Sequence, residues 1–276
     1  MIEVRRLLRL PAVLLNFRKH LPRAWKIALI HGRTNRDFVL SSPALHHQLR
    51  SGGIQLRPLP DALYNRTESF FARSGKGWYN ALLISREFWT FVSIAPHVLL
   101  FEVDSILCPA PTVPIEWWVG RYVIVGAPWH PRWGAGRFWC GSLACCVGNS
   151  GLSLWNRAVM ADLWANKTLK SHGQFVDRWA ALELQPLGYL GKLPVPASPN
   201  TDLASAFSWE QPPEFTVDRT PWTPFGLHGV QHNWPHPSRW CGRASHGRQQ
   251  CAAFVARCPG LLEVSTNASL DGEAPG

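Results

Sequence analysis

Two acidic residues close the most apolar strand-like segment of the sequence. The segment His97–Val103 (HVLLFEV) carries Glu102 and is followed directly by Asp104. Residues two apart on a strand point to the same face, so this pattern places two carboxylates side by side. Two adjacent carboxylates repel each other unless a cation neutralises them, and such oxygens suit Mn²⁺ or Mg²⁺. Glu102 and Asp104 are therefore candidate metal ligands; the alternative is that they begin a turn and cap the next element.

A histidine far along the chain is the candidate third ligand. His228 lies in the glycine-flanked segment Pro224–Gly229 (PFGLHG). An imidazole nitrogen can complete a metal site that carboxylates begin, although a lone histidine is more often structural or exposed. We expect His228 and Asp104 to share one cation, although they are 124 residues apart.

A run of small residues gives a third candidate segment. Val147–Leu154 (VGNSGLSL) combines glycines, Asn149 and serines. Small residues let the backbone approach a ligand closely, and their N–H groups can bind hydroxyls or phosphate. A plain turn before a helix explains the same residues. We predict a tight turn here, bordering the same pocket as Asp104.

Strand-like and helix-like segments alternate along the chain and must position these residues. Apolar runs predict strands at Ile2–Val4, Trp25–His31, Ile54–Leu59, His97–Val103 and Arg121–Val125. Helical spacing predicts helices at Leu7–His20, Leu45–Leu49 and Tyr79–Val92, with another beginning in Gly151–Ala165. This alternation predicts an α/β fold: a single domain, residues 1–262, with a central, mostly parallel sheet flanked by helices. His97–Val103 is expected to be an interior strand. Three segments are expected to be irregular: the loop His130–Cys146, the connector Leu187–Thr201 and a disordered tail at 263–276.

Composition narrows the class of protein. The 276 residues include 46% hydrophobic and 17% charged residues, with a formal net charge of +10. This balance excludes a disordered chain, and no apolar run approaches the ~20 residues of a membrane span. The seven cysteines form no paired CxxC frame, and their odd number favours reduced, buried thiols. Three Asn-x-Ser/Thr triplets do not settle the compartment.

In order and spacing, these segments resemble a family of predicted glycosyltransferases classed as domain of unknown function 5672. The resemblance covers about Ile2 to Pro259. It rests on Ile2–Arg5, Leu21-Pro22, Trp25–Ile27, His31-Gly32, Tyr79–Leu83, Phe88-Trp89, Val98–Leu107, Tyr122, Gly126–Trp129, Gly148–Leu154, Ala206–Ser208, Glu210 and Pro224–His228. Each piece is short, and their order is what makes the match specific.

The resemblance implies a nucleotide-sugar transferase of the GT-A kind, with Mn²⁺ or Mg²⁺ as its cofactor. Asp104 would hold the cation, His228 would be its nitrogen ligand, and Glu102 stands where the family commonly has a neutral amide. Residues expected to bind the donor are Glu3, Arg5, Asn80, Gly148, Asn149 and Gly151. Expected partners are a nucleotide-sugar donor and an acceptor glycan, protein or lipid; nucleic acid and a membrane span are not expected.

The sequence departs from the family pattern at three positions. The family reads Gly-Asn-Gly-Gly-Leu-Ser-Leu-Arg where this chain has Ser150 and Trp155, and Arg157 is a candidate replacement for the lost arginine. The family also has a Glu-Asp pair before its next helix, where this chain has Val176-Asp177. Asp177 is therefore the candidate catalytic base. We expect donor binding with slow turnover, and a higher rate of sugar release when Val176 is replaced by Glu.

Three functions follow from these observations. The first is a metal-dependent glycosyltransferase that transfers a sugar to a hydroxyl group. The second is a weakened descendant that binds a nucleotide or glycan without transferring sugar, and the third is a basic nucleic-acid-binding protein suggested by the net charge of +10. Sugar-nucleotide hydrolysis would favour the first, whereas steep salt dependence of binding to generic DNA or RNA would favour the third. The donor, the acceptor and the compartment are not specified by the sequence.

Overall fold

A computed structural model describes residues 1–63, 77–128, 147–166, 168–169, 176–209, 223–229 and 258. The chain divides into two compact units, which are described separately. The first unit comprises Met1–Pro58, Phe101–Pro114 and Ser205–Gly276, and the second comprises Leu59–Leu100 and Ile115–Ala204. The predicted loop at 130–146 and the predicted tail at 263–276 lie outside the described residues.

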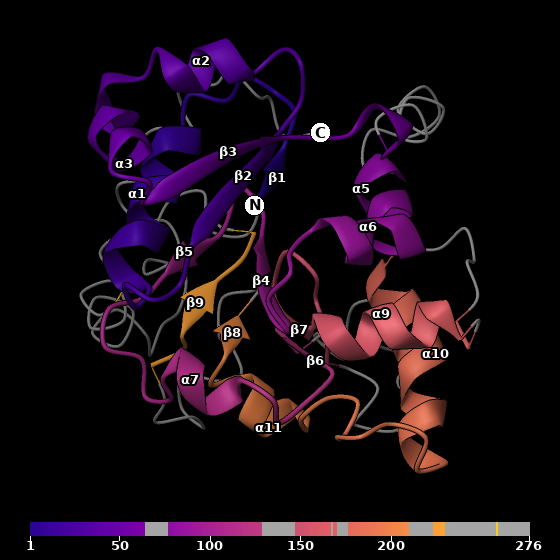
Figure 1. Ribbon diagram of the computed structural model, residues 1–276. Helices are drawn as coiled ribbons and strands as arrows, with labels where there is room; N and C mark the ends of the chain where they lie inside the picture. The colour runs from indigo at the N-terminus through magenta and orange to yellow at the C-terminus, as the bar shows by residue number, and fades with distance from the viewer. Residues whose placement is uncertain are drawn as a thin grey trace. The chain divides into compact units, whose positions relative to one another are not determined.

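A parallel three-stranded sheet with short helices opens the first unit. Its elements are β1 (Ile2–Glu3), α1 (Leu10–His20), β2 (Ile27–His31), α2 (Arg36–Leu40), the 3₁₀ helix η1 (Pro43–Leu45), α3 (His46–Arg50) and β3 (Ile54–Pro58). The strand order is β1-β2-β3, with Ile2 opposite Ile30 and Ile27 opposite Ile54. Figure 1 shows the three strands side by side near α1, α2 and α3.

Helix α1 forms where the sequence predicts it because its apolar residues share one face. Leu10, Val13, Leu14 and Phe17 are fully buried, at the spacing of a helix that packs on one side. A proline lies in the first turn, where its missing N–H is not needed. The helix ends before Pro22, and the guanidinium of Arg18 donates hydrogen bonds to the carbonyls of Leu21, Pro22 and Trp25 at 2.7–2.9 Å.

A second small sheet in the first unit joins segments that are far apart in sequence. It contains β5 (Ile106–Leu107), β8 (Ser208–Trp209) and β9 (Gly226–Leu227), in the order β5-β9-β8. Strand β9 runs antiparallel to β5 and parallel to β8. The residue after β5, Cys108, donates its N–H to the carbonyl of Phe225 and forms a disulfide with Cys258.

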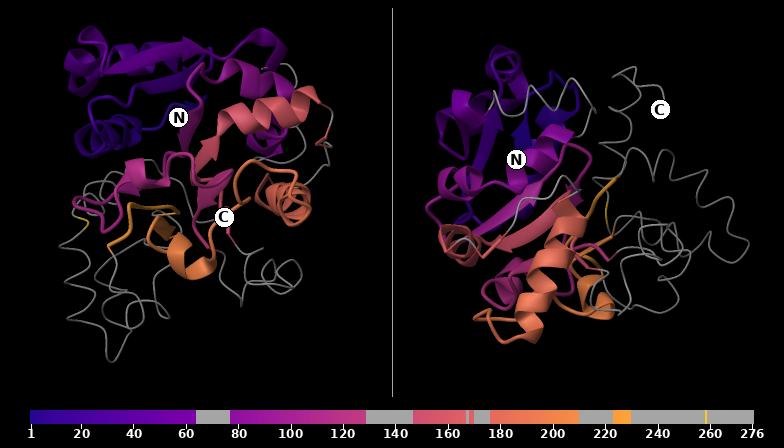
Figure 2. Two further views of the ribbon diagram at one scale, coloured as in Figure 1. Left: turned by 60° about the horizontal axis from the view of Figure 1, so that its bottom comes forward. Right: turned by 90° about the vertical axis from the view of Figure 1, so that its right-hand side faces the viewer.

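The second unit is built from helices and a third small sheet. Its elements are α5 (Gly77–Leu83), α6 (Arg86–Phe91), most of β4 (His97–Phe101), α7 (Ile115–Trp118), β6 (Ile124–Gly126), β7 (Leu152–Asn156), α9 (Arg157–Ala165), α10 (Val176–Tyr189) and α11 (Thr201–Ala204). The strand order is β4-β7-β6, and β6 runs antiparallel to β7. In the left view of Figure 2, α10 is seen nearly along its axis while α9 lies across the view.

Side-chain caps define two of these helices. Ser85 accepts a hydrogen bond from the N–H of Phe88 and starts α6, which splits the predicted helix Tyr79–Val92 into α5 and α6. Asn156 accepts from the N–H of Val159 and starts α9. Both side chains satisfy a helix N–H that has no partner within the helix itself.

The structure confirms a mixed α/β protein and corrects three details of the prediction. The described strands form three small sheets rather than one central parallel sheet. Strand β4 lies at the end of its three-stranded sheet, so it is not the predicted interior strand. The segment Gly151–Ala165 does not begin as a helix, because Leu152–Asn156 pairs with β6 before α9 starts. None of the described helices is long and apolar enough to cross a membrane.

Candidate metal centre

A turn, rather than a continuous strand, positions the two acidic residues. Strand β4 ends at Phe101, and the N–H of Ser105 donates a hydrogen bond of 3.2 Å to the carbonyl of Glu102. The expected alternation along a strand therefore does not apply to Glu102 and Asp104. Within this turn, ligand atoms of Glu102 and Asp104 nevertheless lie within 4.8 Å of each other.

The pairing of β5 with β9 explains why His228 lies beside this turn. Ile106 stands opposite Leu227 in antiparallel register. Ser105, the residue before Ile106, therefore lies next to His228, the residue after Leu227. A backbone hydrogen bond of 2.8 Å from the His228 N–H to the carbonyl of Trp209 fixes the chain on the other side.

The three side chains are close enough to share one ion. The Nε2 atom of His228 lies 3.4 Å from Oδ1 of Asp104 and 3.8 Å from Oε2 of Glu102. All three candidate ligand atoms lie within 4.8 Å of one another. Two ligands of one octahedral ion at about 2.1 Å are about 3 Å apart when adjacent and about 4 Å apart when opposite. The two distances from His228 fall in this range, and two carboxylates with one imidazole form a donor set that suits a divalent cation such as Mn²⁺ or Mg²⁺.

Burial and charge act in opposite directions on His228. Its side chain is only 12% exposed, and this burial alone lowers the pKa of the imidazole. The negative charges of the nearby Asp104 and Glu102 carboxylates outweigh the burial and raise the pKa well above 6.5. A site that stabilises a buried positive charge on this imidazole also suits a metal cation placed among the same three groups.

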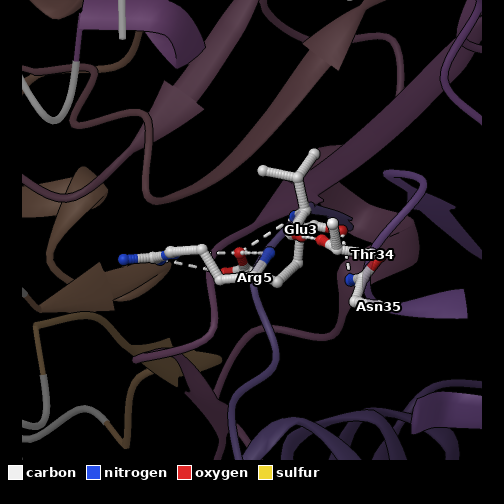
Figure 3. Close-up of polar contacts among 5 residues, drawn as sticks. Glu3, Arg5, Thr34 and Asn35 are labelled. Carbon is white, nitrogen blue, oxygen red and sulfur yellow. Dashed lines mark hydrogen bonds and ion pairs between the residues drawn. The ribbon is translucent and has the colours of Figure 1, made fainter. Parts of the chain in front are cut away.

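Glu3 and Arg5, which are expected to bind the donor, form an ion pair at the end of β1. One oxygen of the buried Glu3 carboxylate accepts the N–H groups of Val4 and Arg5 and the Nε–H of Arg5, at 2.8–3.0 Å. The other oxygen accepts from Nη2 of Arg5 at 3.0 Å. Glu3 thus fixes both the backbone and the half-exposed guanidinium of Arg5 (Figure 3).

Thr34 and Asn35, which the sequence does not single out, follow β2 and bind the backbone at the end of β1. The Thr34 hydroxyl donates to the carbonyl of Val4 at 2.9 Å, and the fully buried Asn35 donates its amide to the carbonyl of Glu3 at 2.6 Å. In Figure 3, Asn35 and the Arg5 guanidinium lie on opposite sides of Glu3. The available signal was the pair of short polar residues directly before α2, a common helix start.

The other expected site residues lie in the second unit and contact one another there. The Asp177 carboxylate, in the first turn of α10, accepts the N–H of Ser150 at 2.9 Å. The Asn80 side chain accepts the N–H of Val176 at 2.7 Å. Side chains from α5 and α10 and the backbone before β7 therefore meet at the start of α10.

The small residues before β7 form a turn that is shorter than the predicted turn Gly148–Leu154, because Leu152–Leu154 belong to β7. Gly148 has a φ of 129°, which favours glycine, and Asn149 accepts the N–H of Gly151 through its side-chain oxygen. A Cβ on Gly126 would collide with the carbonyl oxygen of Asn149, so this glycine allows the turn to pack against β6. Asp104 belongs to the first unit, and a shared pocket with this turn stays a prediction.

Trp155 and Val176, two of the residues that depart from the family pattern, are buried and pack inside the second unit. Trp155 is fully buried, packs 5.0 Å from the ring of Trp89, and donates its Nε1–H to the hydroxyl of Ser153. Arg157 donates to the carbonyls of Ala95 and Trp89. The side chain of Val176 is also fully buried.

The disulfide corrects the expectation that the thiols are reduced. Cys108 and Cys258 are joined across 150 residues, within the same unit as the candidate ligands. An odd cysteine count leaves at least one thiol outside disulfides, but it does not exclude a disulfide between two others. Structural disulfides are typical of oxidising compartments.

Comparison with known proteins now decides the family. Residues 62–228 match a family model described as "Protein of unknown function (DUF5672)", which covers more than half of the chain. The chain belongs to this family. The match includes Glu102 and Asp104 and ends at His228, so all three candidate ligands lie within the DUF5672 region.

A crystal structure of the galactosyltransferase LgtC, in complex with donor and acceptor sugar analogs, is similar over 97% of this chain and 93% of that chain. The TM-score of that match is 0.48 and the sequence identity is 12%. No curated protein matches the DUF5672 chain in sequence.

Proposed function

We propose that this DUF5672 protein is a metal-dependent glycosyltransferase that transfers a sugar from a nucleotide-sugar donor to a hydroxyl group of a glycan, protein or lipid acceptor. The observation that carries the proposal is the cluster of Glu102, Asp104 and His228, which combines two carboxylates and an imidazole within 4.8 Å. The ordered sequence resemblance from about Ile2 to Pro259 supports it. In this proposal, residues 1–262 form one GT-A-like domain that includes both compact units.

The residues of the first unit would bind the charged part of the donor. Glu102, Asp104 and His228 would hold Mn²⁺ or Mg²⁺, and Glu3 would fix the guanidinium of Arg5 toward the nucleotide. When bound, the cation supplies positive charge that stabilises the departing diphosphate.

The residues of the second unit would bind the sugar and the acceptor. Asn80 and the turn containing Gly148, Asn149 and Gly151 would contact the donor. Asp177 would accept the proton of the attacking hydroxyl, a contribution of about 10²–10⁴ in rate for a general base. Its hydrogen bond with the Ser150 N–H holds the carboxylate at the edge of that turn.

Thermal shift measurements test the binding half of this proposal. A panel of nucleotide diphosphate sugars is added with and without Mn²⁺, because a ligand that binds only the native state raises its melting temperature. We expect at least one donor to stabilise the protein only with Mn²⁺, and Asp104→Ala to abolish that shift. Asp37→Ala is the matched control, since it removes an exposed carboxylate from the same unit. A metal-independent shift, or one that survives in Asp104→Ala, contradicts the proposal.

A second candidate function is donor or glycan binding without efficient transfer. It is favoured by Val176, whose buried side chain occupies the position of the family's glutamate. Sugar release from the stabilising donor distinguishes the two functions. Metal-dependent release that is lost in Asp177→Asn supports the transferase, and Mn²⁺-dependent binding without any release supports the binding protein.

A further inference from the structure

Two adjacent residues of α1 contact both flanks of the Glu102–Ser105 turn. On one flank, the ring of Phe17 stacks on the ring of Phe101 with centroids 3.6 Å apart and an interplanar angle of 10°. On the other flank, the side chain of Asn16 reaches Leu107. Phe101 and Leu107 therefore bracket the turn, and both are anchored to one turn of a single helix.

Asn16 takes the place of a neighbouring strand for β5. Its Oδ1 accepts the N–H of Leu107 at 2.7 Å, and its Nδ2 donates to the carbonyl of the same residue at 3.4 Å. An amide that both accepts from and donates to one backbone residue reproduces the pairing of a sheet edge. Asn16 is only 5% exposed, so these bonds form in a buried environment where leaving either group unpaired is costly.

The candidate metal site depends on β5 keeping its position. Strand β5 has two residues, and its pairing with the two residues of β9 is what brings His228 to Asp104. A two-residue ladder has little stability of its own. The amide of Asn16 holds the edge of β5, while β9 occupies its other edge.

We propose that Asn16 and Phe17 are positioning residues of the metal site, which hold the Glu102–Ser105 turn in register with His228. Neither side chain is a ligand. They act by fixing Phe101 and Leu107, which flank the segment that carries Glu102 and Asp104. This inference deepens the proposed function and rests on its metal site.

The test measures the affinity for Mn²⁺ alone, by isothermal titration calorimetry on the full chain at a temperature where every variant is folded by circular dichroism. Asn16→Leu removes both hydrogen bonds at similar volume, and Phe17→Leu removes the stacked ring. Val13→Ala is the control: it removes fully buried methyl groups from the same helix without altering either positioning residue. We expect Kd to rise roughly tenfold in Asn16→Leu and in Phe17→Leu, the low end for changes outside the ligand shell, and to change less than twofold in Val13→Ala.

Each outcome of these titrations either supports the inference or overturns it. Affinity that is unchanged in Asn16→Leu overturns the inference, and so does equal weakening in Val13→Ala, which would indicate a general effect of stability. If Asn16→Leu does not fold, Phe17→Leu against Val13→Ala decides by the same criteria. A wild-type chain that does not bind Mn²⁺ overturns the proposed function itself, which is distinguishable from wild-type binding that the variants leave intact.

Discussion

The proton and the metal compete for the same imidazole in the proposed site. The carboxylates of Asp104 and Glu102 hold the pKa of His228 well above 6.5 although burial opposes this. A protonated imidazole cannot bind a cation, so the metal must displace the proton. We predict that the Kd for Mn²⁺ falls as pH rises toward this raised pKa, by up to about tenfold per pH unit.

As pH rises, the affinity for Mn²⁺ is expected to increase, whereas the free energy of unfolding of the metal-free protein is expected to decrease. A pKa raised by folding stabilises the native state fully below the unfolded value of about 6.5, and this contribution is lost as pH rises through the folded value. Calorimetric titration with Mn²⁺ and urea unfolding without metal, each across pH 6 to 9, measure the two effects. An Mn²⁺ affinity independent of pH over this range would contradict His228 as a ligand.

At the residue level, the sequence located the candidate ligands but gave the wrong local geometry. Glu102 and Asp104 were recognised because a buried strand ended in two carboxylates, and His228 because it stood between glycines late in the chain. The turn that joins the carboxylates depends on a backbone hydrogen bond to Glu102, which a strand-like apolar run does not reveal. Asn16 was not recognised, because a polar residue among helical apolar positions carries no sign of its partner.

At the level of elements, the sequence predicted α1 and β2 but missed α10, the longest described helix, and most of the two-residue strands. The buried residues of α1 show the helical period, and β2 is recognisable as a continuous apolar run. Strands β5, β8 and β9 have two residues each, too few for any periodicity. Their pairing depends on partners up to 121 residues away in sequence, as for Ile106 and Leu227.

The start of α10 gives a prediction at this scale. Val176 is fully buried, and its N–H is bound by Asn80. Val176→Glu restores the family's carboxylate and is expected to raise the rate of sugar release. The same change buries a carboxylate, so we predict that it lowers the free energy of unfolding by about 2 kcal/mol or more.

Urea unfolding and donor turnover, measured on the same preparations, separate the two effects of Val176→Glu. Leu182→Glu is the control, because it adds the same charge to an exposed position of the same helix. It should alter the free energy of unfolding by no more than about 0.5 kcal/mol. Equal stability of wild type and Val176→Glu would show that this position is open to solvent.

At the scale of the whole molecule, the α/β class was predictable and the arrangement of sheets was not. Alternation of strand-like and helix-like segments depends only on local pattern. Which strands share a sheet depends on contacts between distant segments, and the three described sheets each combine strands separated by at least one other element. The disulfide was missed for the same reason, since the sequence shows seven cysteines without their distances.

The disulfide supplies the prediction for the whole molecule. Cys108 and Cys258 close a segment of 150 residues, and the bond joins Cys258 to the residue that follows β5. Restricting the unfolded chain over such a loop contributes up to about 5 kcal/mol in the loop-entropy model. We predict that dithiothreitol lowers the melting temperature of the wild-type protein more than that of Cys258→Ser, because the variant has already lost this bond. Mass spectrometry after alkylation of the unreduced protein should leave Cys108 and Cys258 unlabelled. If both are alkylated in the unreduced protein, the disulfide between them is absent and the prediction is wrong.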